Sequence, residues 1–123
     1  MNWRMGLILV VVIVVLLGFK MLGQVGNATA MEYLKQGAKV IDVRSVGEFQ
    51  SGHLPNAINI PVGEIEHQIS EQVTNKNQVL LLHCASGVRS AMAAKTLKRL
   101  GYTNVFNLGS YARAEAIVRG SQK

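Results

Sequence analysis

The hydrophobic residues of this chain form one long unbroken run, followed by a series of short runs. Residues 5–19 carry no charged or polar side chain, and a basic residue stands on either side of them. A segment of about 20 apolar residues is long enough to cross a bilayer. We therefore expect residues 5–23 to form one transmembrane helix that contacts lipid, within an anchor that comprises residues 1–24.

Two other structures would also contain such a run. A buried core helix is disfavoured because the run is hydrophobic on every side and rich in Val and Ile. A cleaved secretory signal is indicated by the small residues 28–30, but a lysine and a long polar stretch separate them from the run. An uncleaved anchor is therefore favoured. The slight excess of Lys and Arg after the run predicts a single-pass membrane protein whose folded domain is cytoplasmic.

After residue 24, short apolar runs alternate with stretches of helical periodicity. Ile65, Ile69 and Val73 have helical spacing, whereas the apolar residues 78–83 are typical of a strand covered on both faces. This alternation predicts a three-layer α/β domain around a parallel sheet of four or five strands. The predicted strands are residues 39–43, 56–61, 78–83 and 104–108; the predicted helices are residues 30–36, one turn within 45–53, a helix around 65–73, residues 90–100 and a last helix within 109–118.

Charge is distributed unevenly along the chain. Residues 24–75 contain three Lys or Arg against six Asp or Glu, whereas residues 76–123 contain eight Lys or Arg against a single acidic residue. The basic half favours anionic ligands, but few aromatic residues accompany the basic ones, so we expect no nucleic-acid partner. Lys95, Lys98 and Arg99 form a basic stripe that would steer anionic substrates, contact lipid headgroups or simply face solvent.

The only cysteine, Cys84, directly follows the most hydrophobic predicted strand. Parallel α/β sheets bind ligands beyond the carboxyl ends of their strands, and the helix expected from Ser90 offers unpaired N–H groups there. Gly87 lets the loop turn its amides inward, and Arg89 adds a cation. We therefore expect the pKa of Cys84 to lie well below the ~8.5 of free cysteine; a buried, inert thiol is the alternative.

Two stretches of the sequence resemble the diagnostic motifs of the rhodanese (sulfurtransferase) family. Residues 84–90, CASGVRS, are similar to its active-site loop, and residues 40–61, VIDVRSVGEFQSGHLPNAINIP, are similar to its other characteristic segment. The resemblance extends over residues 25–118, which we interpret as one rhodanese-like domain followed by a tail, residues 119–123. It implies a three-layer α/β fold with a five-stranded parallel sheet.

The resemblance also implies an enzymatic role. Cys84 would take a sulfane sulfur from a small anionic donor of the thiosulfate or polysulfide type, become a persulfide, and pass the sulfur to a thiol or cyanide. Asp42 and Arg44 would brace the catalytic loop, and Glu48 would pair with Arg44. The residues implied as the substrate cradle are Ala85, Ser86, Gly87, Val88 and Arg89.

Other features refine this hypothesis. The chain has no second cysteine, so the sulfur must leave to an external thiol acceptor, and no internal disulfide is possible. No cofactor is implied, and the three scattered histidines predict no metal site. His53 is expected to be structural and His67 exposed. Ser110 stands where the family has a second glycine, and the last helix lacks the family's tryptophan, which predicts different packing around the cradle.

Two alternatives to sulfur transfer remain. The first is a non-catalytic binding or scaffold module at the membrane, against which the intact cysteine, glycine and arginine of the loop argue. The second is a phosphatase or arsenate reductase relative. These relatives have a loop one residue longer, whereas the four residues between Cys84 and Arg89 suit a sulfur atom better than a tetrahedral oxyanion.

Overall fold

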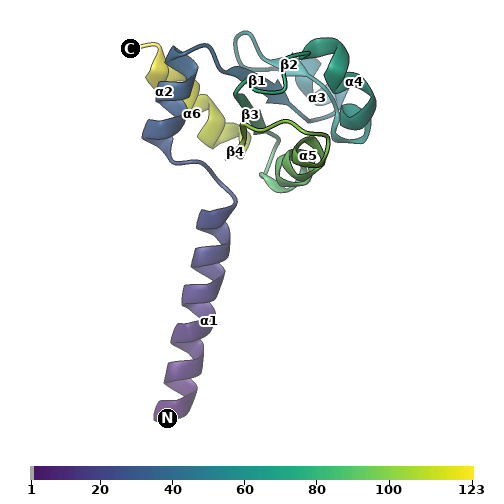
Figure 1. The fold of residues 1–123 in the computed structure, drawn as a ribbon. Coiled ribbons are helices and arrows are strands. Elements are labelled where there is room, and N and C mark those ends of the chain that lie inside the picture. The colour runs from purple at the N-terminus through teal and green to yellow at the C-terminus, as the bar shows by residue number, and fades with distance from the viewer. Residues whose placement is uncertain (1) are drawn as a thin grey trace.

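The computed structural model describes residues 2–123, and their side chains except at residues 17–22. A long helix, α1 (Trp3–Leu22), leads into an α/β domain (Figure 1). The strands of the domain are β1 (Lys39–Asp42), β2 (Ile58–Asn59), β3 (Leu80–His83) and β4 (Val105–Gly109). Its helices are α2 (Asn27–Lys35), α3 (Val46–Gln50), the short 3₁₀ helix η1 (Val62–Glu64), α4 (Ile65–Gln72), α5 (Val88–Arg99) and α6 (Tyr111–Ser121).

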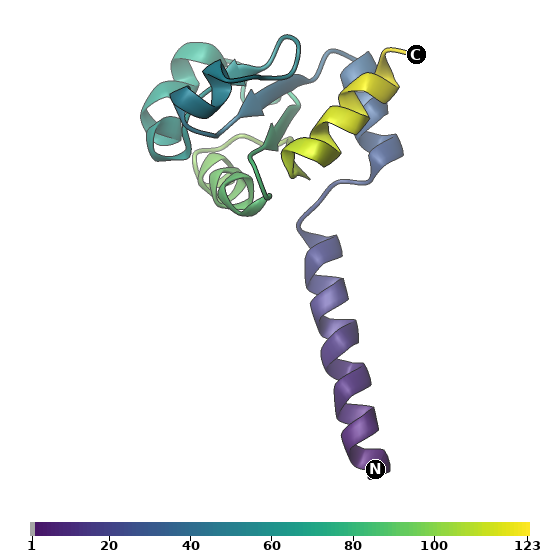
Figure 2. The ribbon, with the colours of Figure 1, turned by 180° about the vertical axis from the view of Figure 1, so that it is seen from behind.

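The sheet is parallel throughout, in the order β2-β1-β3-β4. Side chains alternate between its two faces, and each face has its own core. Ile41 and Leu82 pack toward α4 and α5 on one face, whereas Val40 and Leu81 pack toward α2 and α6 on the other (Figures 1 and 2). The predicted three-layer α/β architecture is therefore confirmed, and β3 lies between the two layers of helices with all four residues buried.

The prediction of a five-stranded sheet is wrong for the part of the chain that the structure describes, in which the sheet has four strands. The chain that arrives from α1 does run along the outer edge of β4, where the Val25 N–H donates to the Asn107 carbonyl at 3.1 Å. Only Gln24 and Val25 lie between Gly23 and Gly26, and α2 begins at Asn27. Among the described residues this segment makes one main-chain hydrogen bond to β4, that of Val25, and it is not a strand of the sheet.

Helix α1 has many exposed apolar side chains. From Met5 to Leu16 its large hydrophobic residues are 46–64% exposed. Among the residues whose side chains the structure describes, no helix is both long enough and apolar enough to cross a membrane. The predicted transmembrane helix over residues 5–23 is thus not supported, and its part at residues 17–22 lies outside the described side chains.

Candidate active site

Cys84 lies immediately beyond the carboxyl end of the central strand β3. Its N–H donates to the Gly109 carbonyl at 3.2 Å, which ties the start of the loop to the end of β4. The side chain has no exposed surface. Its Sγ accepts a hydrogen bond from the Gly87 N–H at 3.0 Å and lies 3.5 Å from the Ser90 hydroxyl. The loop and the first turn of the helix that follow Cys84 therefore cover its sulfur.

Gly87 is the residue that allows this loop to close over the sulfur. Its φ of +101° lies in the left-handed region that favours glycine. A Cβ at this position would also lie 3.2 Å from the Gly109 Cα. The same residue is the N-cap of α5, which begins at Val88, two residues earlier than the sequence predicted. The first turn of α5 thus starts beside Sγ, where the unpaired N–H groups of a helix are found.

Hydrogen bonds control the charge of the Cys84 sulfur. Burial by itself raises the pKa of the thiol. The Ser90 hydroxyl and the main-chain N–H groups of Ser90, Gly87 and Ser86 act in the opposite direction and outweigh burial, so the pKa is lowered. The direction agrees with the expectation from sequence, and the physical cause is the set of donors around a sulfur from which water is excluded.

Ser90 belongs to this site although the sequence analysis did not single it out. Its hydroxyl has one proton and three acceptors in reach: Asn107 Oδ1 at 2.7 Å, the Gly87 carbonyl at 3.1 Å and Sγ at 3.5 Å. An ionised sulfur attracts that proton more strongly than a neutral one. Asn107 also donates to the Gly87 carbonyl at 3.3 Å. A buried asparagine within the apolar segment 104–108 was the available signal.

Arg89 and Glu48 form an ion pair at the rim of the loop. The two Arg89 Nη atoms lie 2.7 and 3.0 Å from the two Glu48 carboxylate oxygens, and both side chains are about one-third exposed. Glu48 also closes a capping box with Ser45 at the start of α3. The hydrogen bond from Arg89, followed by that from the Ser45 N–H, lowers the pKa of Glu48 to about 2. The expected Glu48–Arg44 pair is therefore wrong, because Glu48 binds Arg89 instead.

Arg44 pairs with Asp42 inside the protein. Asp42 Oδ1 accepts from the Arg44 N–H at 2.9 Å and from Nε at 3.0 Å, and Oδ2 accepts from Nη2 at 2.7 Å. The guanidinium lies 4.6 Å from the ring centre of Tyr111, whose N–H donates to the Ala85 carbonyl at 3.3 Å. A chain of contacts thus runs from this pair to the loop, as a bracing role requires.

His53 and His67 are both exposed, as expected for His67, and Ser110 has local contacts. The exposed ring of His53 stacks on Phe49 at 3.8 Å, and its Nδ1 lies 2.9 Å from the Phe49 carbonyl. His67 lies on α4. Ser110 caps α6 by accepting from the Arg113 N–H at 3.1 Å and forms an isolated bridge to Ser86. No group of three or more metal-binding side chains occurs among the described residues.

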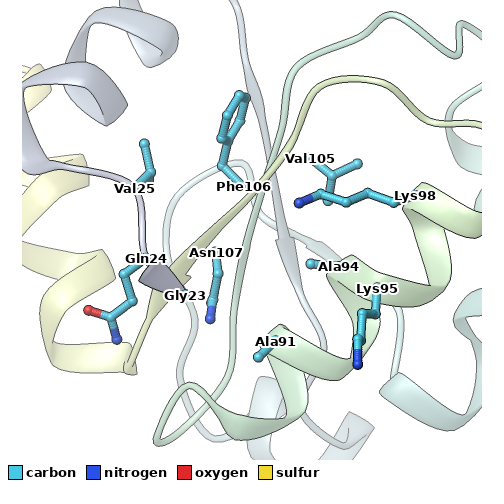
Figure 3. A pocket seen from close by; sticks show the side chains of 10 residues that line it. All are labelled: Gly23, Gln24, Val25, Ala91, Ala94, Lys95, Lys98, Val105, Phe106 and Asn107. Atoms are coloured by element: carbon cyan, nitrogen blue, oxygen red, sulfur yellow. The ribbon is translucent and has the colours of Figure 1, made fainter. Parts of the chain in front are cut away.

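A hollow lies between α5 and the segment that precedes α2. Figure 3 shows Gln24 and Asn107 on one side of it, with Lys95 and Lys98 reaching from α5 on the other. A larger hollow of about 850 Å³ shares Gln24 and Lys95 and extends to the loop at Gly87. The third residue of the predicted basic stripe, Arg99, is paired with Glu66 at 3.2 Å instead. Lys95 thus borders the hollow that extends to the loop, whereas Lys98 borders only the smaller hollow next to it.

The model of the Rhodanese-like domain family matches residues 27–114, which is more than half of the chain. The chain belongs to the rhodanese-like family. It is 37% identical over 73 residues to the putative sulfur carrier protein YrkF of Bacillus subtilis, covering 59% of this chain and 38% of that protein. It is also 39% identical over 69 residues to thiosulfate sulfurtransferase PspE of Escherichia coli, covering 56% of this chain and 66% of that protein. The chain thus spans less than two thirds of the length of these curated relatives.

Solved structures share the rhodanese fold with this chain. A rhodanese with anions from E. coli superimposes with a TM-score of 0.61 at 35% identity, covering 63% of this chain and 91% of that one. The human single-domain sulfurtransferase TSTD1 superimposes with a TM-score of 0.64 at 28% identity, covering 75% and 94%.

Proposed function

We propose that this rhodanese-like chain is a sulfurtransferase that moves a sulfane sulfur through Cys84. The observation that carries the proposal is the environment of Cys84. Its thiol is buried, and its pKa is lowered because main-chain N–H groups and a hydroxyl donate hydrogen bonds to the sulfur. Such donors stabilise a thiolate, the form of cysteine that attacks sulfur. The names of the relatives PspE and TSTD1 support the same class of reaction.

The transfer has two displacement steps. In the first, the Cys84 thiolate attacks the outer sulfur of a donor such as thiosulfate; the new Sγ–S bond forms while the donor S–S bond breaks, and its electron pair leaves on sulfite. In the second, a thiolate or cyanide acceptor attacks the outer sulfur of the persulfide. The Sγ–S bond breaks, and its electron pair returns to Cys84 as the thiolate.

The loop has to admit the donor. Because Cys84 has no exposed surface, residues 85–88 must move outward for a donor sulfur to reach Sγ. The main-chain N–H groups of Ala85, Ser86, Gly87 and Val88 then surround the outer sulfur, and Arg89 balances the negative charge of the donor. Arg89 is half-buried and its pair with Glu48 is partly solvated, so the guanidinium can exchange Glu48 for the donor.

Anionic reagents have a favourable route to the loop. Lys95 borders the hollow that reaches the loop, and Lys98 borders the adjoining smaller hollow. Among the described residues neither lysine has an acidic partner within ion-pair distance. Two uncompensated cations attract small anions and raise their local concentration. Replacing both lysines with Glu is expected to lower kcat/KM for thiosulfate at low salt. The matched control is Lys35→Glu with Lys39→Glu, which changes net charge equally near the opposite end of β1.

We further infer that α1 associates the domain with a lipid bilayer, on its cytoplasmic side. The support is the row of exposed apolar side chains between Met5 and Leu16, since exposed apolar surface of this extent marks interaction sites. Flotation of the full chain with liposomes is the test. The chain should float and a Val11→Lys, Val14→Lys variant should float less; equal behaviour of the two would contradict lipid association.

The experiment for the enzymatic proposal measures thiocyanate formed from thiosulfate and cyanide, together with the mass of the protein after incubation with thiosulfate alone. The wild type should turn over and gain the mass of one sulfur atom, and Cys84→Ser should do neither. A wild type that gains no sulfur from thiosulfate or polysulfide, while a known sulfurtransferase in the same assay does, would leave a binding or scaffold role.

A further inference from the structure

His83 is a fully buried histidine that the sulfur chemistry described above does not use. It is the last residue of β3 and directly precedes Cys84. Its ring has no exposed surface and meets the ring of Tyr111 from α6 edge-on, with centres 5.6 Å apart. A buried imidazole needs partners for both ring nitrogens, because an unsatisfied polar atom away from water is costly.

The two ring nitrogens of His83 have very different partners. Nδ1 lies 3.2 Å from the carbonyl oxygen of Cys84. A carbonyl oxygen only accepts, so this contact is a hydrogen bond only when Nδ1 carries the proton. Nε2 lies 3.7 Å from Asp42 Oδ2, beyond hydrogen-bond distance, and has no hydrogen-bond partner among the described residues. The environment therefore selects the neutral tautomer that is protonated at Nδ1.

Charge near the ring keeps it neutral. The groups that face it are Asp42 at the end of β1, Arg44 two residues after it, Tyr111 from α6 and the carbonyl of Cys84. Burial lowers the pKa of His83 most, and the Arg44 cation lowers it further; Asp42 and the bond to Cys84 oppose them without reversing the shift. Because Asp42 is already bound by Arg44, its carboxylate does not draw a second proton onto Nε2.

The bond from Nδ1 fixes the orientation of one peptide group of the active-site loop. In a trans peptide the C=O and the following N–H point in opposite directions. With the Cys84 carbonyl turned toward His83, the Ala85 N–H points away from the ring. No acceptor binds this N–H among the residues that the structure describes.

We propose that His83 is a positioning residue, whose Nδ1–H holds the Cys84 carbonyl out of the cradle and so keeps the Ala85 N–H available to the transferred sulfur. Without this bond the peptide can turn over and place a carbonyl oxygen where the N–H was. An oxygen there repels both a thiolate and the outer sulfur of a persulfide. The expected effect on kcat/KM rests on the proposed sulfur transfer, whereas the expected ring tautomer and Cys84 pKa do not.

Three substitutions in the full chain separate the two nitrogens. The Asn amide of His83→Asn places its N–H near the position of Nδ1, that of His83→Gln reaches toward the position of Nε2, and His83→Phe retains the ring shape without either. His53→Phe is the control, since His53 is exposed and contacts Phe49. The readouts are kcat/KM for thiosulfate, the Cys84 pKa from the pH dependence of its alkylation, and the ¹⁵N NMR shifts of the His83 ring.

The wild type should show His83 protonated at Nδ1. His83→Phe and His83→Gln should each lower kcat/KM by about 10-fold or more. They should also raise the Cys84 pKa, since the freed carbonyl oxygen of Cys84 can then turn toward the negative charge on the sulfur. His83→Asn and His53→Phe should stay close to the wild type in both measurements. If His83→Phe does not fold, comparing kcat/KM and the Cys84 pKa of His83→Asn with those of His83→Gln shows whether a donor at the position of Nδ1 is required.

Three results would overturn the role of His83: protonation at Nε2, rescue by Gln but not by Asn, or three variants that all match the wild type. Failure of the proposed function looks different. In that case the wild type transfers no sulfur at all, while the ring tautomer and the effect of each variant on the Cys84 pKa still test the positioning role.

Discussion

Two acid–arginine pairs lie at the carboxyl edge of the sheet, and they differ mainly in burial. Asp42 and Arg44 lie inside the protein, with the Asp42 side chain fully buried and that of Arg44 10% exposed. Glu48 and Arg89 form a pair of the same length, 2.7 Å, at the rim of the loop, where their side chains are 36% and 34% exposed. The chemistry of the contacts is the same, but the second pair is far more accessible to water.

Burial assigns different tasks to the two pairs. Removing one partner of a buried pair leaves an uncompensated charge away from water, which is strongly destabilising. An exposed pair contributes little to stability because water replaces the lost partner. The inner pair is therefore suited to hold the site in place, and the outer pair to release Arg89 toward a substrate.

The largest expected effect comes from breaking the inner pair. Asp42→Asn leaves Arg44 buried without its carboxylate and should lower the free energy of unfolding by about 3–5 kcal/mol, measured by urea denaturation. The control is Glu66→Gln, which breaks the exposed Arg99–Glu66 pair and should cost at most about 1 kcal/mol. Equal losses in the two variants would show that burial does not distinguish the pairs.

Breaking the outer pair should affect activity rather than stability. Arg89→Gln removes the cation beside the sulfur and should lower kcat/KM for thiosulfate by about 10²-fold, with the urea midpoint almost unchanged. Arg99→Gln, on the same helix but paired with Glu66, is the control and should retain activity. A large loss of stability in Arg89→Gln would give Arg89 the structural task assigned here to Arg44.

Gly87 lies in the active-site loop, two residues before Arg89, and donates its N–H to the Cys84 sulfur. Gly87→Ala forces a left-handed φ of +101° on Ala and puts its Cβ 3.2 Å from the Gly109 Cα, which should cost about 1–3 kcal/mol and displace the N–H from Sγ. Gly101 has a φ of +97° but no atom within 4 Å of an added Cβ. Gly101→Ala should therefore share the backbone strain and retain full sulfur transfer. Activity lost equally in both variants would argue against a local effect of Gly87 on Cys84.

The sequence allowed most of the fold to be predicted, because the apolar runs that become β1, β3 and β4 are short, buried and separated by helical periodicity. The fifth strand could not be excluded in this way, since it depends on how few residues remain between α1 and the first turn of α2. The sequence analysis also missed the ion pair between Glu48 and Arg89, because the two residues are far apart in the sequence. Glu48 is four residues from Arg44 in sequence, but the capping box with Ser45 turns it toward Arg89, 41 residues away.

A smaller effect is expected when only the orientation of Arg89 is disturbed. Glu48→Gln retains one hydrogen-bond acceptor for the guanidinium but removes the charge. Because the pair is exposed, its loss should lower kcat/KM by less than about 10-fold. A loss as large as that of Arg89→Gln would show that Arg89 works only while it is bound to Glu48.

The smallest expected effect is on the pH dependence of the free energy of unfolding at acid pH. The pKa of Glu48 is lowered from 4.5 to about 2, so its pairing stabilises the fold fully above about pH 4.5 and is lost as the pH falls toward 2. Urea midpoints of the wild type and Glu48→Gln should therefore differ slightly at neutral pH and converge in that acid range. A difference that grows toward acid pH would contradict this assignment.

The most direct test of the central claim is the pH dependence of the alkylation rate of Cys84 by iodoacetamide in the full chain. Hydrogen bonds from Ser90, Gly87 and Ser86 should place its midpoint below the ~8.5 of free cysteine, and Ser90→Ala should raise it. A midpoint at or above that of free cysteine, unchanged in Ser90→Ala, would show that the loop does not stabilise the thiolate on which sulfur transfer depends.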